Sequence, residues 1–141
     1  MIQAKLYLKQ YEEAEQIVRR LKTEYEVETD KIDTIRSSIG DGTPHGGATA
    51  KTVEIRALKL AEKALEWKQA ELDALQIRQE IVGAINKVPG AWGQVLYERY
   101  INFKTWDDVA DAVGYSKRQA QRIHGEALRL LEDVIECHSM S

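Results

Sequence analysis

Prolines occur at only two positions of this 141-residue chain, Pro44 and Pro89. Proline lacks the backbone N–H that a helix interior needs and its ring clashes with the preceding turn, so it ends most helices. The rest of the chain is rich in Ala, Leu, Glu, Lys, Gln and Arg, which are the strongest helix formers. The sequence therefore predicts an all-α protein whose helices are interrupted near residue 44 and at residue 89.

The composition around these two prolines predicts the domain organisation. Glycine, proline and small polar residues cluster over residues 37–50, which predicts a linker between two long helices. Residues 1–88 are expected to form a long antiparallel helical hairpin of coiled-coil type. Residues 89–141 are expected to form a second domain that ends in a short flexible tail.

The first long helix carries a heptad pattern, because its apolar residues recur at alternating spacings of four and three. Glu28 occupies the one position of this seam that is not apolar. The members of the seam are Tyr7, Tyr11, Ala14, Val18, Leu21, Tyr25, Ile32, Ile35 and Ile39. A helix of this length cannot bury such a stripe without a partner.

The second long helix carries two neighbouring apolar stripes, a width that suits a helix with two neighbours. One stripe contains Leu58, Ala61, Leu65, Leu72, Leu75 and Val82. The other contains Val53, Ala57, Leu60, Ala64, Trp67, Ala74, Ile81, Ile85 and Val88. A hairpin that packs on itself and a coiled-coil surface that forms a homodimer satisfy these patterns equally well. Both alternatives remain open on the sequence.

Residues 106–123 have the pattern of a helix, a tight turn and a second helix. Thr105 is placed to cap the first helix, and Gly114 to end it with a positive φ. Ser116 and Gln119 have the spacing of a capping box at the start of the second helix. The sequence therefore predicts a helix-turn-helix.

Polar side chains of the kinds that read DNA face outward at the start of this second helix. They are Lys117, Arg118, Gln121 and Arg122, with Gln119 beside them. Arginine and lysine neutralise phosphates and bind guanine, and glutamine can pair with adenine. Residues 115–129 hold four basic side chains and one acidic side chain, although the whole chain has a net charge of −3. The charge pattern therefore favours a DNA-binding surface here and not on the long helices.

Four segments of the carboxyl-terminal half resemble the fourth region of bacterial sigma factors, and more closely the RinA/ArpU-like transcriptional regulators of phages and prophages. These segments are Leu96–Ile101, Lys104–Ala110, Gly114–Ser116 and Arg122–Leu131. That group also has a long helical amino-terminal half and a short Gly/Pro linker. The resemblance implies sequence-specific binding of double-stranded DNA and control of late genes through host RNA polymerase. It implies DNA contacts by Lys117, Arg118, Gln121 and Arg122, and a phosphate contact by Lys104.

The sequence gives no pattern typical of an enzyme or a metalloprotein. Cys137 is the single cysteine, His124 has no second ligand one helical turn away, and no pair of carboxylates with a nearby histidine suggests acid–base chemistry. We therefore expect no catalytic residue, metal or cofactor. No apolar run is long enough to span a membrane and residues 1–8 do not resemble a signal peptide, so we expect residence in the cytoplasm of a bacterial host cell.

Two other functions fit the same pattern. A phage small terminase subunit also joins a helix-turn-helix to an oligomerising helical region, but it serves genome packaging. A helical protein-interaction module would use the motif for protein contacts, as parts of the sigma fourth region do. A ring of many subunits in solution would favour the terminase, and a monomer or dimer would favour the regulator.

Overall fold

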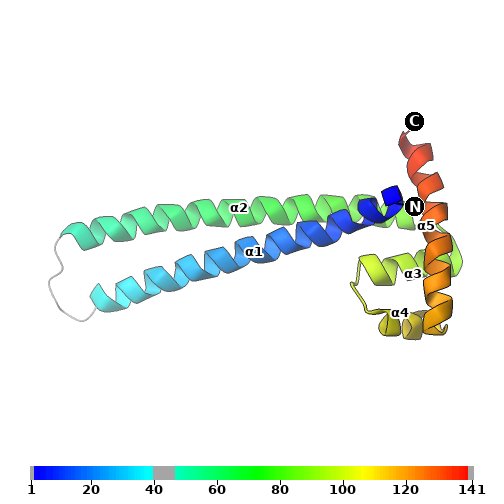
Figure 1. Ribbon diagram of the computed structural model, residues 1–141. Helices are drawn as coiled ribbons and strands as arrows, with labels where there is room; N and C mark the ends of the chain where they lie inside the picture. Colours follow the sequence, from blue (N-terminus) through cyan, green and yellow to red (C-terminus); the bar gives the residue numbers. More distant parts are fainter. Residues whose placement is uncertain (1, 40–46, 140–141) are drawn as a thin grey trace. The chain divides into compact units, whose positions relative to one another are not determined.

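A computed structural model describes residues 2–39 and 47–139 of the chain. All regular secondary structure in these two ranges is helical, which confirms the predicted all-α class. The helices are α1 (Ile2–Ile39), α2 (Gly47–Ile85), α3 (Gly90–Tyr100), α4 (Trp106–Val113) and α5 (Lys117–Ser139) (Figure 1).

The helices extend further than the predicted linker and tail allow. Helix α1 continues to Ile39 and α2 begins at Gly47, so residues 37–39 and 47–50 of the predicted linker are helical. Residues 40–46 lie outside the described residues. Helix α5 continues to Ser139, and the last two residues of the predicted tail are likewise outside the description.

Packing divides the chain into two compact units. Unit 1 contains Met1–Ala14 and Ala74–Ser141, and unit 2 contains Glu15–Asp73. Each of the two long helices therefore contributes residues to both units. The compact unit that holds α3, α4 and α5 also takes in the start of α1 and the end of α2, whereas the sequence predicts a boundary at residue 88.

The larger core of unit 1 joins the start of α1 to helices that follow it by more than seventy residues. Leu8, Ile81, Leu96 and Leu131 are fully buried in it. The hydroxyl of Tyr7 donates a hydrogen bond to the backbone carbonyl of Glu80, 3.3 Å away. The first turns of α1 are thus part of the structure that supports α3 and α5.

The joint between α2 and α3 depends on a glycine. Pro89 precedes the first residue of α3 in an extended conformation, with φ −78° and ψ 157°. Gly93 is buried in the next turn, where a β-carbon would collide with the backbone carbonyl of Val88. The missing side chain at Gly93 therefore allows α3 to start directly against the end of α2.

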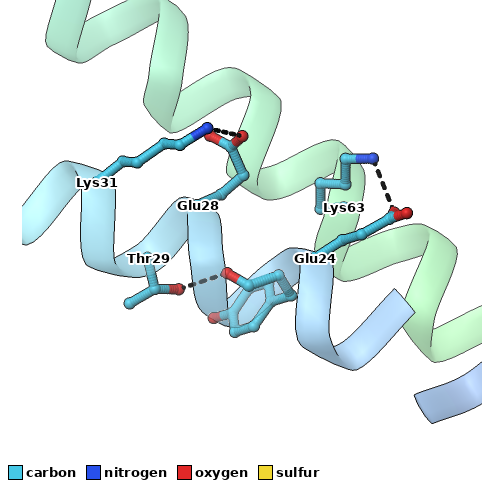
Figure 2. Close-up of polar contacts among 6 residues, drawn as sticks. Glu24, Glu28, Thr29, Lys31 and Lys63 are labelled. Atoms are coloured by element: carbon cyan, nitrogen blue, oxygen red, sulfur yellow. Dashed lines mark hydrogen bonds and ion pairs between the residues drawn. The ribbon is translucent and has the colours of Figure 1, made fainter. Parts of the chain in front are cut away.

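Unit 2 consists of parts of α1 and α2 that contact each other through mixed polar and aromatic pairs. The Lys63 ammonium lies 3.0 Å from a Glu24 carboxylate oxygen (Figure 2). The rings of Tyr25 and Trp67 lie 5.3 Å apart. The Glu24 carboxylate raises the pKa of Lys63, mainly by accepting this hydrogen bond. These contacts pair the two helices within unit 2.

Glu28 is buried in unit 2, with only 7% of the residue exposed. One carboxylate oxygen lies 3.5 Å from the Lys31 ammonium, one helical turn along α1 (Figure 2). The other oxygen, Oε2, has no hydrogen-bond partner. The single polar position of the heptad seam is therefore a buried carboxylate that is only half satisfied.

The two apolar stripes of α2 differ in exposure. The stripe that includes Trp67 and Ile81 is half-buried or buried at most of its positions. In the other stripe, Leu58, Leu65 and Leu72 are 69%, 72% and 56% exposed. A helix with two covered faces was expected from the sequence, and within unit 2 one of these faces is open.

Over residues 2–39 and 47–139, no helix has both the length and the apolar character that crossing a membrane requires.

Candidate nucleic-acid interface

A turn of three residues, Gly114 to Ser116, joins α4 to α5. Gly114 adopts the left-handed conformation, with φ 77° and ψ 28°. The backbone N–H groups of Gly114 and Tyr115 both donate to the carbonyl of Ala110, at 3.0 and 3.1 Å. This closure satisfies the end of α4 and reverses the chain, as the sequence predicts for a glycine at this position.

Both helices begin with the predicted caps. The hydroxyl of Thr105 accepts a hydrogen bond from the Asp108 backbone N–H at 3.3 Å. At the start of α5, the Gln119 N–H donates to the Ser116 hydroxyl, and the Ser116 N–H donates to the Gln119 side-chain carbonyl, each at 3.2 Å. This reciprocal pair is a capping box, and it fixes the direction in which α5 leaves the turn.

A second, smaller core lies beneath the turn. Val95, Val109 and Ile123 come from α3, α4 and α5 and are buried together, with Trp106 and Val113 packed against them. Ala120 is completely buried where α5 crosses its neighbours. These contacts hold the first turns of α5 in one position relative to α3 and α4.

Four of the six predicted DNA contacts lie together on the exposed side of α5 near its start. Arg118, Gln121 and Arg122 are exposed and have no ion pair within the described residues. Lys117 is also exposed, and its ammonium lies 3.7 Å from an Asp107 carboxylate oxygen at the start of α4. Because both groups of this pair are in solvent, their attraction is weak and a phosphate can replace it.

The other two predicted contacts are engaged within the protein. The side-chain carbonyl of Gln119 forms the capping box with Ser116. The ammonium of Lys104 pairs with the Glu98 carboxylate, whose pKa is lowered mainly by this hydrogen bond. The Lys104 backbone carbonyl accepts a hydrogen bond from Arg99 at 2.8 Å. Gln119 and Lys104 therefore have structural contacts here in addition to the role expected of them.

An aromatic cluster centred on His124 of α5 also contains Tyr100 of α3 and Trp106 of α4. The Tyr100 hydroxyl and the His124 Nε2 atom lie 2.7 Å apart, and the Trp106 ring meets the imidazole edge-on with centroids 4.8 Å apart. Burial lowers the pKa of His124 to about 4, assisted by the positive charges of Lys5 and Arg99. The imidazole is therefore neutral at pH 7.

Two features of this region are absent from the sequence-based interpretation. The indole N–H of Trp92 donates to a Glu126 carboxylate oxygen at 2.9 Å, which ties down the single acidic residue of the stretch from 115 to 129. Lys5 and Lys9 from the start of α1 line a pocket together with Arg99 and His124. No local motif marks either feature, because each joins residues far apart in the chain.

Among the described residues, no group of three or more His, Cys, Asp or Glu side chains is arranged to hold a metal ion. A scan against protein-family models finds no match, and searches of curated proteins and of solved structures find none either.

Proposed function

We propose that this protein is a sequence-specific DNA-binding transcriptional regulator of the phage or prophage type, built as a long helical hairpin followed by a helix-turn-helix. The observation that carries the proposal is the capped turn before α5, which presents Arg118, Gln121 and Arg122 to solvent on a helix held by a core. An exposed helix start with these side chains matches the way recognition helices enter the major groove.

The side chains of the exposed set divide into two roles in this proposal. Arg118, Gln121 and Arg122 approach base edges, where a guanidinium can bind guanine and an amide can bind adenine. Lys117 leaves its weak contact with Asp107 and neutralises a backbone phosphate. The net charge of −3 on the whole chain limits non-specific attraction to DNA, so specificity depends on few contacts.

Selection of bound duplexes from random sequence identifies a target, and the double variant Arg118→Ala/Arg122→Ala then tests the contacts. Each lost base contact costs about 1–3 kcal/mol, so the affinity should fall at least about 30-fold. The matched control is Arg19→Ala/Arg20→Ala, which removes the same charge from exposed positions of unit 2. Equal affinities of the two double variants would contradict the recognition-helix assignment.

The open stripe of α2 supports self-association as the role of the long helices. Leu58, Leu65 and Leu72 repeat at intervals of seven residues, which is the repeat by which helices of coiled coils pair. In an antiparallel pair centred on Leu65, Leu58 of one copy lies level with Leu72 of the other, and Glu62 lies level with Lys68. A parallel pair would place Glu62 level with Glu62 and Lys68 level with Lys68, so that like charges repel. We therefore propose an antiparallel homodimer.

Sedimentation of the full chain tests the dimer. We expect a dimer that dissociates in the variant Leu65→Lys, while Leu6→Lys, a substitution of another exposed leucine, leaves the dimer intact. A wild-type monomer would contradict the proposed pairing. A ring of many subunits would instead favour the small terminase subunit, and host RNA polymerase would then no longer be the expected partner.

A further inference from the structure

A cavity of about 240 Å³ opens in unit 1 beside the aromatic cluster. Its walls come from the first turns of α1, the end of α3, the segment from Phe103 to the start of α4 at Trp106, and His124 of α5. This volume is below the range of about 300–1,000 Å³ typical of pockets for drug-sized ligands. The cavity therefore suits a small chemical group or one end of a larger ligand.

Positive charge dominates the cavity. Lys5, Lys9 and Arg99 line it against one carboxylate, that of Glu12. Within the described part of the chain, neither lysine forms an ion pair, and both are exposed. The pKa of His124 is lowered mainly by burial, and the positive charges of Lys5 and Arg99 lower it further. A group bound here would be an anion.

The cations of this cavity differ in how firmly they are held. The Arg99 guanidinium lies over the Trp106 ring, 4.7 Å from its centroid, and donates to the Lys104 carbonyl. These contacts hold it in place while leaving other N–H donors of its planar fork unused. The two lysines are single charges on flexible stems, which suits them to close on an anion from the α1 side.

An aromatic ring stands at the edge of the cavity. Phe103 is 40% exposed, and it stacks on Tyr11 with ring centroids 5.5 Å apart. Its φ of 56° is unusual for a residue other than glycine, so the surrounding structure holds the backbone of Phe103 in a strained conformation. The exposed part of the ring offers a stacking surface next to the three cations.

We propose that this cavity binds a nucleoside phosphate, with Lys5, Lys9 and Arg99 on the phosphate and Phe103 stacked on the base. Arginine binds phosphate through its planar fork and lysine binds it as a point charge, and base–aromatic stacking needs no particular base. The proposal does not depend on the recognition helix, which uses other residues of α5. The phosphate could belong to a free nucleotide or to a nucleic-acid strand, so the test includes both sources.

Calorimetric titration of the full chain with AMP, adenosine and inorganic phosphate tests the proposal. We expect AMP to bind, and adenosine to bind at least about tenfold more weakly because it lacks the charged group. The variant Lys5→Ala/Lys9→Ala should lose at least about tenfold in AMP affinity, and Lys22→Ala/Lys51→Ala, exposed lysines of unit 2, should lose none. Circular dichroism should show the same helix content in both variants.

Three results would overturn all or part of the proposal. Absence of AMP binding at millimolar concentration, or equal AMP affinity of the two double-lysine variants, would overturn it. Equal affinity for inorganic phosphate and AMP would overturn the stacking role of Phe103. Displacement of AMP by a single-stranded oligonucleotide from the Arg118→Ala/Arg122→Ala variant would assign the cavity to strand phosphate, and retention of AMP would assign it to a free nucleotide.

Discussion

The turn between α4 and α5 in unit 1 and the paired helices of unit 2 satisfy their polar groups to different degrees. At the turn, Thr105, Gly114 and Ser116 each supply a hydrogen bond or a backbone geometry that a helix end requires. Among the described residues of unit 2, side-chain polar atoms of three residues are buried without a hydrogen-bond partner, namely Glu28 Oε2, Arg56 Nε and Trp67 Nε1. The turn is specified by hydrogen bonds between residues close in sequence. The paired helices of unit 2 instead bury polar atoms that lack a hydrogen-bond partner, which lowers their stability.

This difference shows two ways in which a helical chain selects one structure. A capped turn over a small core has few alternatives, because a shift of one residue would lose every cap. Two long heptad helices can pair in several registers, and a buried polar residue in the seam selects among registers at a cost in stability. We infer that Glu28 has this selecting role.

The largest effect is expected from the core of unit 1. Replacing Leu8, which is fully buried, by alanine should reduce the free energy of unfolding by about 2–5 kcal/mol. The matched control is Leu6→Ala, because Leu6 is 60% exposed on the same helix. Urea unfolding monitored by circular dichroism measures both. Equal losses would show that α1 does not pack into unit 1.

The pH dependence of unit 1 should follow His124. Its pKa is about 4 in the folded protein and 6.5 for the unperturbed group, so between these values the unfolded chain binds more protons. Stability is therefore full above pH 6.5 and falls as the pH decreases toward 4, by about 1–2 kcal/mol once solvent screening of the half-buried ring is allowed for. Urea midpoints of the wild type and His124→Gln across this range check the effect. Parallel curves for the two proteins would contradict it.

A smaller loss is expected at the α5 cap. Ser116→Ala removes the hydroxyl that accepts from the Gln119 N–H, so the free energy of unfolding should fall by about 1 kcal/mol. Ser116→Asp keeps an acceptor at the same position and should retain most of the stability. Thermal unfolding of the three proteins distinguishes the cap from a general effect of substitution.

The smallest effect has the opposite sign. Glu28→Leu replaces a buried, half-satisfied carboxylate by an apolar side chain, so unit 2 should gain up to about 1 kcal/mol. The control is Glu26→Leu, at an exposed position of α1, which should change little. Hydrogen exchange of amides in α1 and α2 measures the change within unit 2. A loss of protection in Glu28→Leu would show that the carboxylate stabilises the pairing.

The local part of this architecture could be predicted because each signal lies within a few residues. Gly114, Ser116 with Gln119, and Thr105 were assigned their roles from sequence, and the structure confirms those three local geometries. The sequence also identifies both stripes of α2 and the polar seam position at Glu28. These patterns depend only on helical periodicity and on the geometry of helix ends.

The non-local part could not be predicted from one sequence. Leu8 is not a member of the heptad seam of its helix, and nothing in its neighbours indicates that it packs with Leu96 and Leu131. The two stripes of α2 are equally apolar, so periodicity does not show which of them is covered. The cationic cavity was missed for the same reason, since Lys5 and Arg99 meet only through the fold.

The division of α1 and α2 between two units allows the helices of unit 2 to change in length independently of unit 1. The chain leaves unit 1 after Ala14, forms unit 2, and enters unit 1 again at Ala74. Adding or removing seven residues in each helix would keep the heptad phase within about 20°, so the buried residues of unit 1 would keep their positions. The length of unit 2 can therefore vary by whole heptads, in evolution or by design, without altering the residues that surround the α4–α5 turn.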